Sequence, residues 1–196
     1  MRVVNCVGFG PVRDLVVEER PSPQVQPGTV KVAVGACGVN FVDGLLVEGK
    51  YQIRPPLPFV PGGEVCGVVT EVGEGVTSHQ VGDRVSASTM LGAFAEEVVL
   101  PAAAAVHAPT VLTDAQAATY LQSYGTAHFA LKVRAVPKPG STMLVLGAGG
   151  GVGLAVVDTA VSMGVRVIAA ASSADKREMA LSRGAAAVID TTTDDV

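Results

Sequence analysis

Seven residues from Gly147 to Gly153 are the part of the sequence best suited to bind a ligand. They read Gly-Ala-Gly-Gly-Gly-Val-Gly, and the spacing Gly147-x-x-Gly150-x-x-Gly153 puts a glycine at every third position. Glycines permit a tight turn and let backbone N–H groups approach a pyrophosphate, whose charge the N-terminal end of a following helix also favours. A glycine-rich segment can also be no more than a flexible turn, so its neighbours must decide between the two interpretations.

The elements around this loop favour phosphate binding. The continuous apolar run 142–146 predicts a buried strand before the loop, and residues 152–163 predict an amphipathic helix after it. A second strand at 165–171, a short helix at 175–183 and a third strand at 186–190 follow. This βαβαβ pattern is typical of one mononucleotide-binding half of a doubly wound sheet. We therefore expect the cofactor-binding residues of the loop to be Gly147, Gly150, Gly151, Val152 and Gly153.

The end of the second expected strand bears on which dinucleotide binds. An NAD site usually has Asp or Glu there to hold the ribose 2′-hydroxyl. Here Ser172 and Ser173 occupy that position, with Lys176 and Arg177 close behind. Hydroxyls and cations suit a 2′-phosphate, so we expect NADPH rather than NADH. In the alternative interpretation a serine merely caps the next helix and Lys176 is an exposed surface charge.

The N-terminal half has a different pattern. Short alternating runs at 30–34, 65–72, 82–86 and 94–100 are separated by Gly and Pro, which predicts an all-β barrel or sandwich. An Ala-rich segment from Thr113 to about Val133 then predicts a helix with Thr113 as its N-cap. The fold class is therefore α/β plus β, and we expect a first domain at 1–122 and a second at 123–196.

Composition excludes several classes of protein. Of the 196 residues 48% are hydrophobic, which argues against disorder, while 4% aromatic residues and a net charge of −4 argue against a nucleic-acid partner. The uncharged stretch 139–157 is rich in glycine, so no membrane span is expected. Residues 1–5 show no signal-peptide core, and the three cysteines form no CxxC motif. We expect a cytoplasmic protein in which Cys6, Cys37 and Cys66 are free thiols packed as small apolar residues.

Four segments extend the argument to the whole chain: residues 37–51, residues 58–69, Gly82-Asp83-Arg84-Val85, and Tyr124-Gly125-Thr126-Ala127. Together they closely resemble the medium-chain dehydrogenase/reductase superfamily, and within it the zinc-independent quinone oxidoreductase branch, over about residues 2–193. The resemblance implies a GroES-like β-barrel catalytic domain followed by the first βαβαβ half of a Rossmann domain, with an active site between the two domains.

The resemblance also bears on zinc. Zinc-dependent relatives have Cys where this chain has Asn40 and His where it has Gly63, and their third ligand falls near Gln122. None of these residues supplies a thiolate or an imidazole, so we expect no metal. His79, His107 and His128 are interpreted as surface or packed residues rather than ligands.

The resemblance implies a reaction and site residues. The reaction is NADPH-dependent reduction of a quinone or a related α,β-unsaturated carbonyl by hydride transfer. Asn40 would orient the substrate, Tyr51 would donate to or shield the developing oxyanion, and Thr126 would lie near the nicotinamide. Two structural alternatives remain open: Asn40 as an Asx-turn residue, and Tyr51 packed against Pro55-Pro56.

Chains of this family normally continue well beyond the third Rossmann strand. The sequence given ends at Val196, just past that strand, so strand 142–146 is expected to present an unpaired apolar edge. Three alternatives stay open: the sequence is a fragment, it is a truncated gene product, or a homo-oligomer covers the edge. Two hypotheses follow. The chain is an NADPH-dependent quinone or enone reductase, or it is a catalytically incomplete nucleotide-binding or assembly module.

Overall fold

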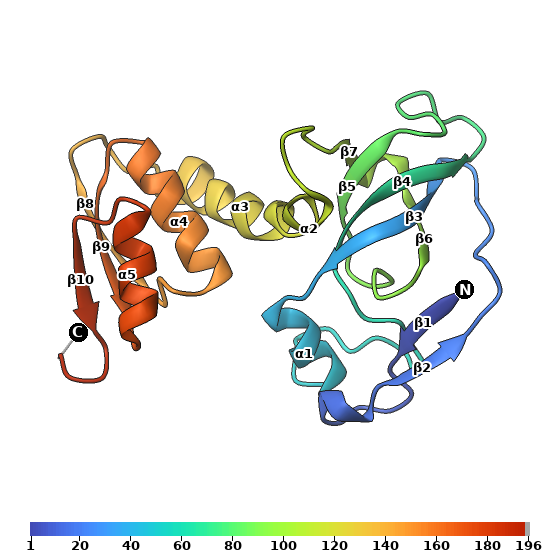
Figure 1. Cartoon of the computed structure of the whole chain (residues 1–196), viewed down its shortest axis with the longest axis horizontal. Helices are drawn as coiled ribbons and strands as arrows, with labels where there is room; N and C mark the ends of the chain where they lie inside the picture. The colour runs from blue at the N-terminus through green and yellow to red at the C-terminus, as the bar shows by residue number, and fades with distance from the viewer. Residues whose placement is uncertain (195–196) are drawn as a thin grey trace. The chain divides into compact units, whose positions relative to one another are not determined.

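The chain folds into two compact units. The computed structural model describes residues 1–194, and the units are Met1–Leu121 and Gln122–Val196 (Figure 1). This boundary lies one residue before the one expected from the sequence. Residues 195 and 196 of the expected second domain lie outside the described residues.

Antiparallel strands build most of the first unit. They are β1 (Arg2–Asn5), β2 (Val16–Glu19), β3 (Thr29–Gly38), β4 (Glu64–Val72), β5 (Arg84–Ser88), β6 (Glu97–Pro101) and β7 (Ala105–His107). β1 pairs with β2, and the other five form one sheet in the order β6-β3-β4-β5-β7. Only the 3-10 helix Ala102–Ala104 connects β6 to β7, although these strands lie at opposite edges of the sheet. The sheet therefore curves round until its edges approach each other, which gives the expected barrel.

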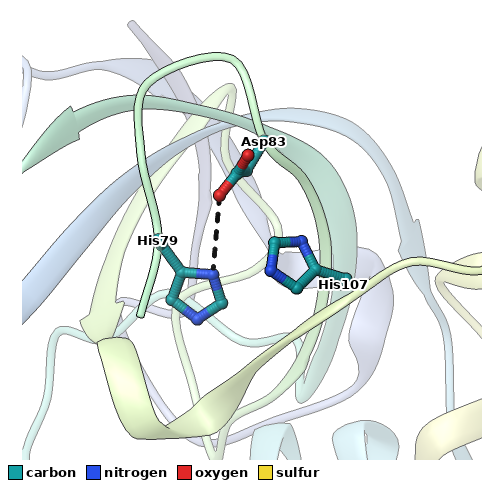
Figure 2. Close-up of side chains that lie close together, drawn as sticks. All are labelled: His79, Asp83 and His107. Atoms are coloured by element: carbon teal, nitrogen blue, oxygen red, sulfur yellow. Dashed lines mark ion pairs between the residues drawn. The ribbon is translucent and has the colours of Figure 1, made fainter. Parts of the chain in front are cut away.

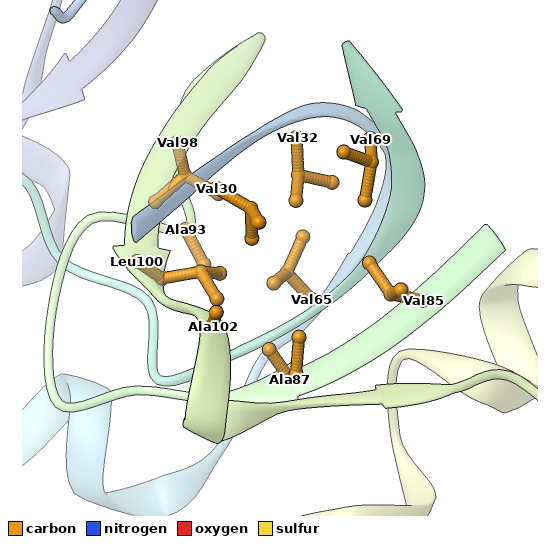
Figure 3. Close-up of a cluster of buried hydrophobic side chains, with 11 residues drawn as sticks. Val30, Val32, Val65, Val69, Val85, Ala87, Ala93, Val98, Leu100 and Ala102 are labelled. Carbon is orange, nitrogen blue, oxygen red and sulfur yellow. The ribbon is translucent and has the colours of Figure 1, made fainter. Parts of the chain in front are cut away.

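Alternating side chains fill the barrel. In β3, Val30 and Val32 are buried, whereas Lys31 between them forms an ion pair with Glu71 on β4. Figure 3 shows the resulting cluster of small apolar side chains, which comprises Val30, Val32, Val65, Val69, Val85, Ala87, Ala93, Val98, Leu100, Ala102 and Ala105. The period-two pattern of the sequence thus becomes a continuous core.

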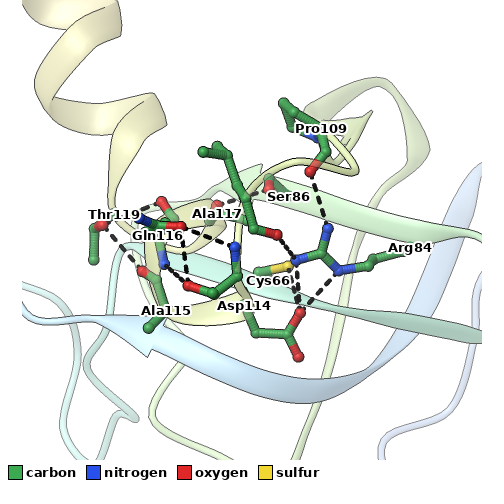
Figure 4. A network of polar contacts seen from close by, with 11 residues as sticks. Cys66, Arg84, Ser86, Pro109, Asp114, Ala115, Gln116, Ala117 and Thr119 are labelled. Atoms are coloured by element: carbon green, nitrogen blue, oxygen red, sulfur yellow. Dashed lines mark hydrogen bonds and ion pairs between the residues drawn. The ribbon is translucent and has the colours of Figure 1, made fainter.

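Short helices add to the barrel of the first unit. A 3-10 helix (Val12–Asp14) precedes β2, and α1 (Phe41–Val47) follows β3. α2 (Asp114–Ala117) is held on the barrel by the network in Figure 4, where Arg84 Nε donates to Asp114 Oδ1 at 2.8 Å and Ser86 Oγ donates to the Ala117 carbonyl at 2.7 Å.

The prediction of a single helix from Thr113 to about Val133 is wrong. The structure has α2, then α3 (Tyr120–His128), then a π-helical segment (Phe129–Ala135). Thr113 is the N-cap as predicted, because its side chain accepts from the Gln116 N–H. The break falls at Thr119, whose hydroxyl donates to the carbonyls of Ala115 and Gln116 and so competes for the backbone acceptors of α2.

The second unit is the predicted βαβαβ unit. Its elements are β8 (Thr142–Leu146), α4 (Gly151–Ser162), β9 (Arg166–Ala171), α5 (Ala174–Ser182) and β10 (Ala187–Asp190). The strands are parallel and ordered β10-β9-β8, and both α4 and α5 pack against them (Figure 1). Gly164 and Gly184 adopt φ of 74° and 95° just past the two helices, where glycine avoids the strain of a side chain. The expected fold class is confirmed.

Polar contacts connect the helices of the second unit. Asp158 on α4 accepts hydrogen bonds from the Tyr124 hydroxyl and, at 2.8 Å, from Arg183 Nη1. The hydrogen bond to Asp158 is the main reason that the pKa of Tyr124 is raised. α3, α4 and the segment after α5 are thereby joined through one carboxylate.

β8 lies at an edge of its sheet, as expected. Leu144 and Leu146 alternate with buried Val145 and are 47% and 67% exposed. Among residues 1–194 no helix combines the length and the apolar character needed to cross a bilayer.

The cysteines differ in part from expectation. Cys6, Cys37 and Cys66 are all free thiols. Cys6 and Cys66 are buried as predicted, and burial raises the pKa of each thiol. The prediction that all three are packed is wrong for Cys37, which is exposed near the end of β3.

Candidate functional site

The glycine loop forms a closed turn between β8 and α4. Gly147 has φ of 62°, and its carbonyl accepts from the Gly150 N–H at 3.0 Å. The Ala148 N–H donates to the Ala170 carbonyl at 3.0 Å, which joins the loop to the end of β9. Gly150 is the N-cap residue of α4, so the start of this helix opens directly from the turn.

Two glycines of the loop leave no room for a side chain. A Cβ on Gly153 would lie 2.2 Å from the Gly147 carbonyl oxygen and 2.8 Å from the Ala148 Cα. A Cβ on Gly149 would lie 2.5 Å from the Cβ and Cγ atoms of Lys176, because the stem of that lysine crosses the loop. A Cβ on Gly147, in contrast, would meet nothing within 4 Å, so a phosphate can approach the backbone there, which fits the dinucleotide cofactor expected from the sequence.

A cavity of about 140 Å³ adjoins the loop. It is lined by Gly147, Gly149, Gly150, Ala170, Ala171, Ser172, Lys176 and Thr191. The structure therefore brings four predicted cofactor-binding residues together, namely Gly147, Gly150, Ser172 and Lys176. Sequence reasoning missed Thr191, although it directly follows β10 and the carboxyl ends of parallel strands meet at one edge of a sheet.

Arg177 and Lys176 have different surroundings. Arg177 Nη2 pairs with Asp190 Oδ2 at 2.9 Å, and its Nη1 donates to the Ala171 carbonyl at 3.1 Å. Hydrogen bonds from Thr192 lower the pKa of Asp190, and Arg177 lowers it further. Because Arg177 is occupied in joining β9 to β10, Lys176 is the cation that lines the cavity.

The other predicted cofactor residues lie near this cavity or on a different helix. Gly151, Val152 and Gly153 form the first turn of α4. Ser173 is the N-cap residue of α5, which corresponds to the structural alternative for a serine here. Thr126 is exposed on α3. Among the described residues none of these five lines the 140 Å³ cavity, and their cofactor roles stay predictions.

Asn40 occupies the N-cap position of α1 beside two buried carboxyl groups. Its backbone N–H donates to Asp43 Oδ2 at 2.7 Å, and its Nδ2 donates to Glu64 Oε2 at 3.5 Å. Burial raises the pKa of Asp43, while the N–H groups of Asn40, Gly62 and Gly63 oppose this shift. Asn40 thus has a local structural role at the start of α1, as in the Asx-turn alternative. Its side-chain amide also contacts the buried carboxylate of Glu64.

A cavity of about 370 Å³ opens at Asn40. Its lining is mostly apolar and comprises Val12, Leu15, Val39, Asn40, Phe41, Asp43, Gly44, Leu45, Val47, Glu48 and Phe94. A larger cavity of about 470 Å³ shares Leu15, Val39 and Phe94 with it and includes Cys37. Apolar cavities of this size with a few polar groups are typical of sites for small molecules.

Tyr51 lies beyond the opposite end of α1 from Asn40. It is half-buried and packs against the cluster of Cys6, Leu46, Val47 and Phe59. Within the described part of the chain it is not among the residues that line the 370 Å³ cavity. Its role as a donor to the substrate stays a prediction.

A barrel followed by a parallel βαβαβ unit with a glycine loop is an arrangement found in dinucleotide-dependent dehydrogenases and reductases. Comparisons with known proteins narrow this class. The model of the alcohol dehydrogenase GroES-like domain matches residues 26–110, and that of the zinc-binding dehydrogenase family matches residues 151–196.

Relatives agree with these family models. The chain is 45% identical to a quinone oxidoreductase-like protein 2 homolog of Nematostella vectensis, over 100% of this chain and 53% of that protein. It is similar to a mycobacterial protein solved with NADPH, with a TM-score of 0.93, 38% identity, and coverage of 99% of this chain and 60% of that one. Escherichia coli quinone oxidoreductase complexed with NADPH gives a TM-score of 0.95 and 30% identity, with coverage of 100% and 60%.

The chain belongs to the medium-chain dehydrogenase/reductase superfamily, in its quinone oxidoreductase branch. It spans about half the length of the curated relatives it matches and about 60% of the solved structures.

Proposed function

We propose that this chain is part of an NADPH-dependent oxidoreductase that reduces quinones or related α,β-unsaturated carbonyls without zinc. The observation that carries the proposal is the cavity beside the glycine loop, where Lys176 and Ser172 lie with the open backbone of Gly147 and Gly150. Among solved structures of the same fold, the mycobacterial protein and Escherichia coli quinone oxidoreductase were each solved with NADPH.

The chain's own residues divide the binding of the cofactor between them. The backbone of the glycine loop and the N-terminal turn of α4 would hold the pyrophosphate. Lys176 and Ser172 would bind the 2′-phosphate through an ion pair and a hydroxyl hydrogen bond. Ala171 ends β9 without a carboxylate, so the position where an acid would repel a 2′-phosphate is occupied by an apolar residue.

The apolar cavity at Asn40 is the proposed site for the acceptor. Its size and lining suit a flat, weakly polar molecule such as a quinone. When bound, a nicotinamide cofactor would supply the hydride for the reduction. Asn40 carries two amide hydrogens, of which one is directed to Glu64, so the second is available to orient the carbonyl oxygen of the acceptor.

We propose that hydrogen-bond donors, and not a metal ion, stabilise the negative charge that develops on the reduced acceptor. Asn40 and Gly63 stand where zinc-dependent relatives have a thiolate and an imidazole, and neither residue supplies a metal ligand of that kind. Asn40, with Tyr51 as a second donor or shield, would act on the developing oxyanion.

Two further assignments belong to the proposal. The apolar edge of β8 supports a homo-oligomer, since Leu144 and Leu146 would be covered by a second copy. The three free thiols support a reducing compartment such as the cytoplasm.

The first test is a fluorescence titration of the chain with NADPH and NADH. We expect saturable binding with NADPH tighter than NADH, and Lys176→Gln should weaken NADPH about 10-fold with little effect on NADH, because one charge-assisted contact is worth about 1.5–3 kcal/mol. Arg166→Gln is the matched control, since it removes a cation at the opposite end of β9. Equal affinity for both cofactors would contradict the assignment of the 2′-phosphate.

The second part of the test follows NADPH oxidation with 1,4-benzoquinone and an enone, with and without EDTA. Turnover that is insensitive to EDTA supports the zinc-free reductase. Tight NADPH binding without turnover would instead identify the chain as a nucleotide-binding or assembly module, and turnover abolished by EDTA would overturn the assignment of a metal-free site.

A further inference from the structure

A second group of side chains with the chemistry of a binding site lies on the barrel, beside a cavity that shares no lining residue with the cavities described above. His79 lies in the loop between β4 and β5, Asp83 directly precedes β5, and His107 ends β7 (Figure 2). β5 and β7 are paired with Val85 opposite His107, so the sheet brings residues 24 positions apart to one place. The three side chains offer ligand atoms that all lie within 4.8 Å of one another.

The state of His79 indicates what this group binds. Its Nε2 lies 3.2 Å from the Ala102 carbonyl oxygen, which can only accept a hydrogen bond. Nε2 of the neutral ring therefore carries the hydrogen, and Nδ1 presents a lone pair. Histidines that ligate a metal characteristically have their second nitrogen fixed in this way by a backbone carbonyl.

The Nδ1 atom of His79 is buried next to the carboxylate of Asp83. The side chain is 4% exposed, and Nδ1 has no hydrogen-bond partner among the described residues. Asp83 Oδ2 lies 4.0 Å from Nδ1, which is within ion-pair distance of a charged imidazole (Figure 2) but beyond hydrogen-bond distance. A buried polar atom without a hydrogen bond costs free energy. A ligand bound between the imidazole and the carboxylate would remove this cost.

Asp83 and His107 complete the donor set. The Asp83 carboxylate is held in place because its Oδ2 accepts from the Gln80 N–H at 2.9 Å. The rings of His79 and His107 have their centroids 5.1 Å apart. A polar cavity of about 390 Å³ adjoins the three residues and is lined by Thr77, Ser78, His79, Gln80, Asp83 and His107. Solvent and an ion therefore have access to the group.

The distances fit a site that closes on its ligand. Zinc bonds to histidine nitrogen are about 2.0–2.1 Å long and those to carboxylate oxygen about 2.0–2.2 Å, so three ligand atoms around one ion lie about 3–4 Å apart. The present spacing requires a contraction of about 1 Å. The His107 side chain can supply it, because His107 is exposed at the end of β7, whereas His79 and Asp83 are largely buried.

We propose that His79, Asp83 and His107 form a binding site for a divalent transition-metal ion, with Zn²⁺ as the ion that best suits two imidazoles and one carboxylate. His79 binds through Nδ1, and water occupies the remaining position of a tetrahedral site. This proposal goes beyond the proposed reductase function and does not depend on it. It replaces, for these two histidines, the sequence-based interpretation as surface or packed residues.

The test is equilibrium dialysis of the whole chain against Zn²⁺ without NADPH, with bound zinc measured by mass spectrometry. We expect one equivalent of Zn²⁺ at pH 7.5. His107→Ala and Asp83→Asn should each weaken binding by about 10-fold or more, since even loss of a group supporting a ligand costs 10–100-fold. Binding should weaken at acidic pH, because protons compete with a metal ion for histidine nitrogen.

Control variants make the result specific. His107 is exposed, and asparagine at position 83 keeps an oxygen for the Gln80 N–H, so neither variant threatens the barrel. His128→Ala removes an exposed histidine of the second unit, and Cys37→Ser removes the exposed thiol; both should bind Zn²⁺ like the unmodified chain. The proposal is overturned if no saturable binding occurs, if His107→Ala binds equally well, or if Cys37→Ser alone abolishes binding.

Discussion

Asp43 shows how a single buried side chain links local structure to the candidate substrate site. Its carboxyl group accepts a hydrogen bond from the backbone N–H of Asn40, the N-cap residue of α1. Asp43 and Asn40 also line the same cavity. Burial raises the pKa of this carboxyl more than the surrounding N–H groups lower it. Keeping the Asp43 carboxylate ionised and buried beside Asn40 therefore costs free energy at neutral pH.

This cost predicts a pH effect on stability. Because the folded state holds the Asp43 proton more tightly than the unfolded chain, the group favours folding at low pH, and this contribution is lost as the pH rises through the raised pKa. The free energy of unfolding of Asp43→Asn, measured relative to the unmodified chain by urea denaturation, should therefore increase from pH 4 to pH 7. A difference that stays constant over this range would contradict the raised pKa.

Lys176 and Arg177 show that adjacent residues of equal charge can differ in function. Arg177 is fixed by Asp190 and the Ala171 carbonyl, whereas Lys176 crosses Gly149 and lines the cavity. From the sequence alone, both residues are candidate partners of a 2′-phosphate. Only the contacts of each side chain distinguish the structural cation from the one available to a ligand.

At the scale of elements, the first turn of α4 shapes the glycine loop of the proposed cofactor site. It packs directly against the loop before it, with the Gly147 carbonyl in the space that a Cβ on Gly153 would take. The same close approach keeps the start of the helix next to the end of β8. The requirement for glycine at 153 is thus one of packing between two consecutive elements.

A pair of glycine variants tests this requirement. Gly153→Ala should lower the stability of the chain by about 1–3 kcal/mol through overpacking and should weaken NADPH binding. Gly125→Ala in α3, where nothing lies within 4 Å of the added Cβ, should raise stability by about 0.5–1 kcal/mol because alanine favours a helix. Thermal unfolding and an NADPH titration measure both effects, and equal changes in the two variants would count against the packing argument.

At the scale of the whole molecule, each unit has its own hydrophobic core, and β8 is an edge strand of the sheet in the second unit. Val145 of β8 is buried, while Leu144 and Leu146 on either side of it remain substantially exposed. Unpaired strands with apolar side chains are a recognised cause of association between chains.

Association of this kind can be measured directly. The weight-average mass of the unmodified chain should rise with concentration in sedimentation or light-scattering experiments, and Leu146→Lys should reduce this rise. Val111→Lys is the matched control, because Val111 is 87% exposed but lies in a loop of the first unit. An equal effect of both variants would show that added charge, not the edge of β8, governs association.

Patterns that extend over only a few neighbouring residues predicted a large part of this fold. The strands at 142–146 and 165–171, the helix after the glycine loop and its end before Gly164 all follow from periodicity and turn residues within a few positions. α1 and the β1–β2 pair were not predicted, because β1 and β2 are short and β1 finds its partner more than ten residues away. The interruption at Thr119 was missed because helical spacing continues across it.

The sequence by itself determined the superfamily, the barrel, the βαβαβ unit and the glycine loop, because these depend on local spacing and on motifs that keep their order along the chain. Tertiary structure decided which side chains meet. It joined Arg177 to Asp190, placed Thr191 beside the glycine loop, and brought His79 and Asp83 to His107 through the pairing of β5 with β7. The physical reason is that strand pairing and side-chain burial depend on the whole fold, whereas periodicity and turn chemistry act over a few residues.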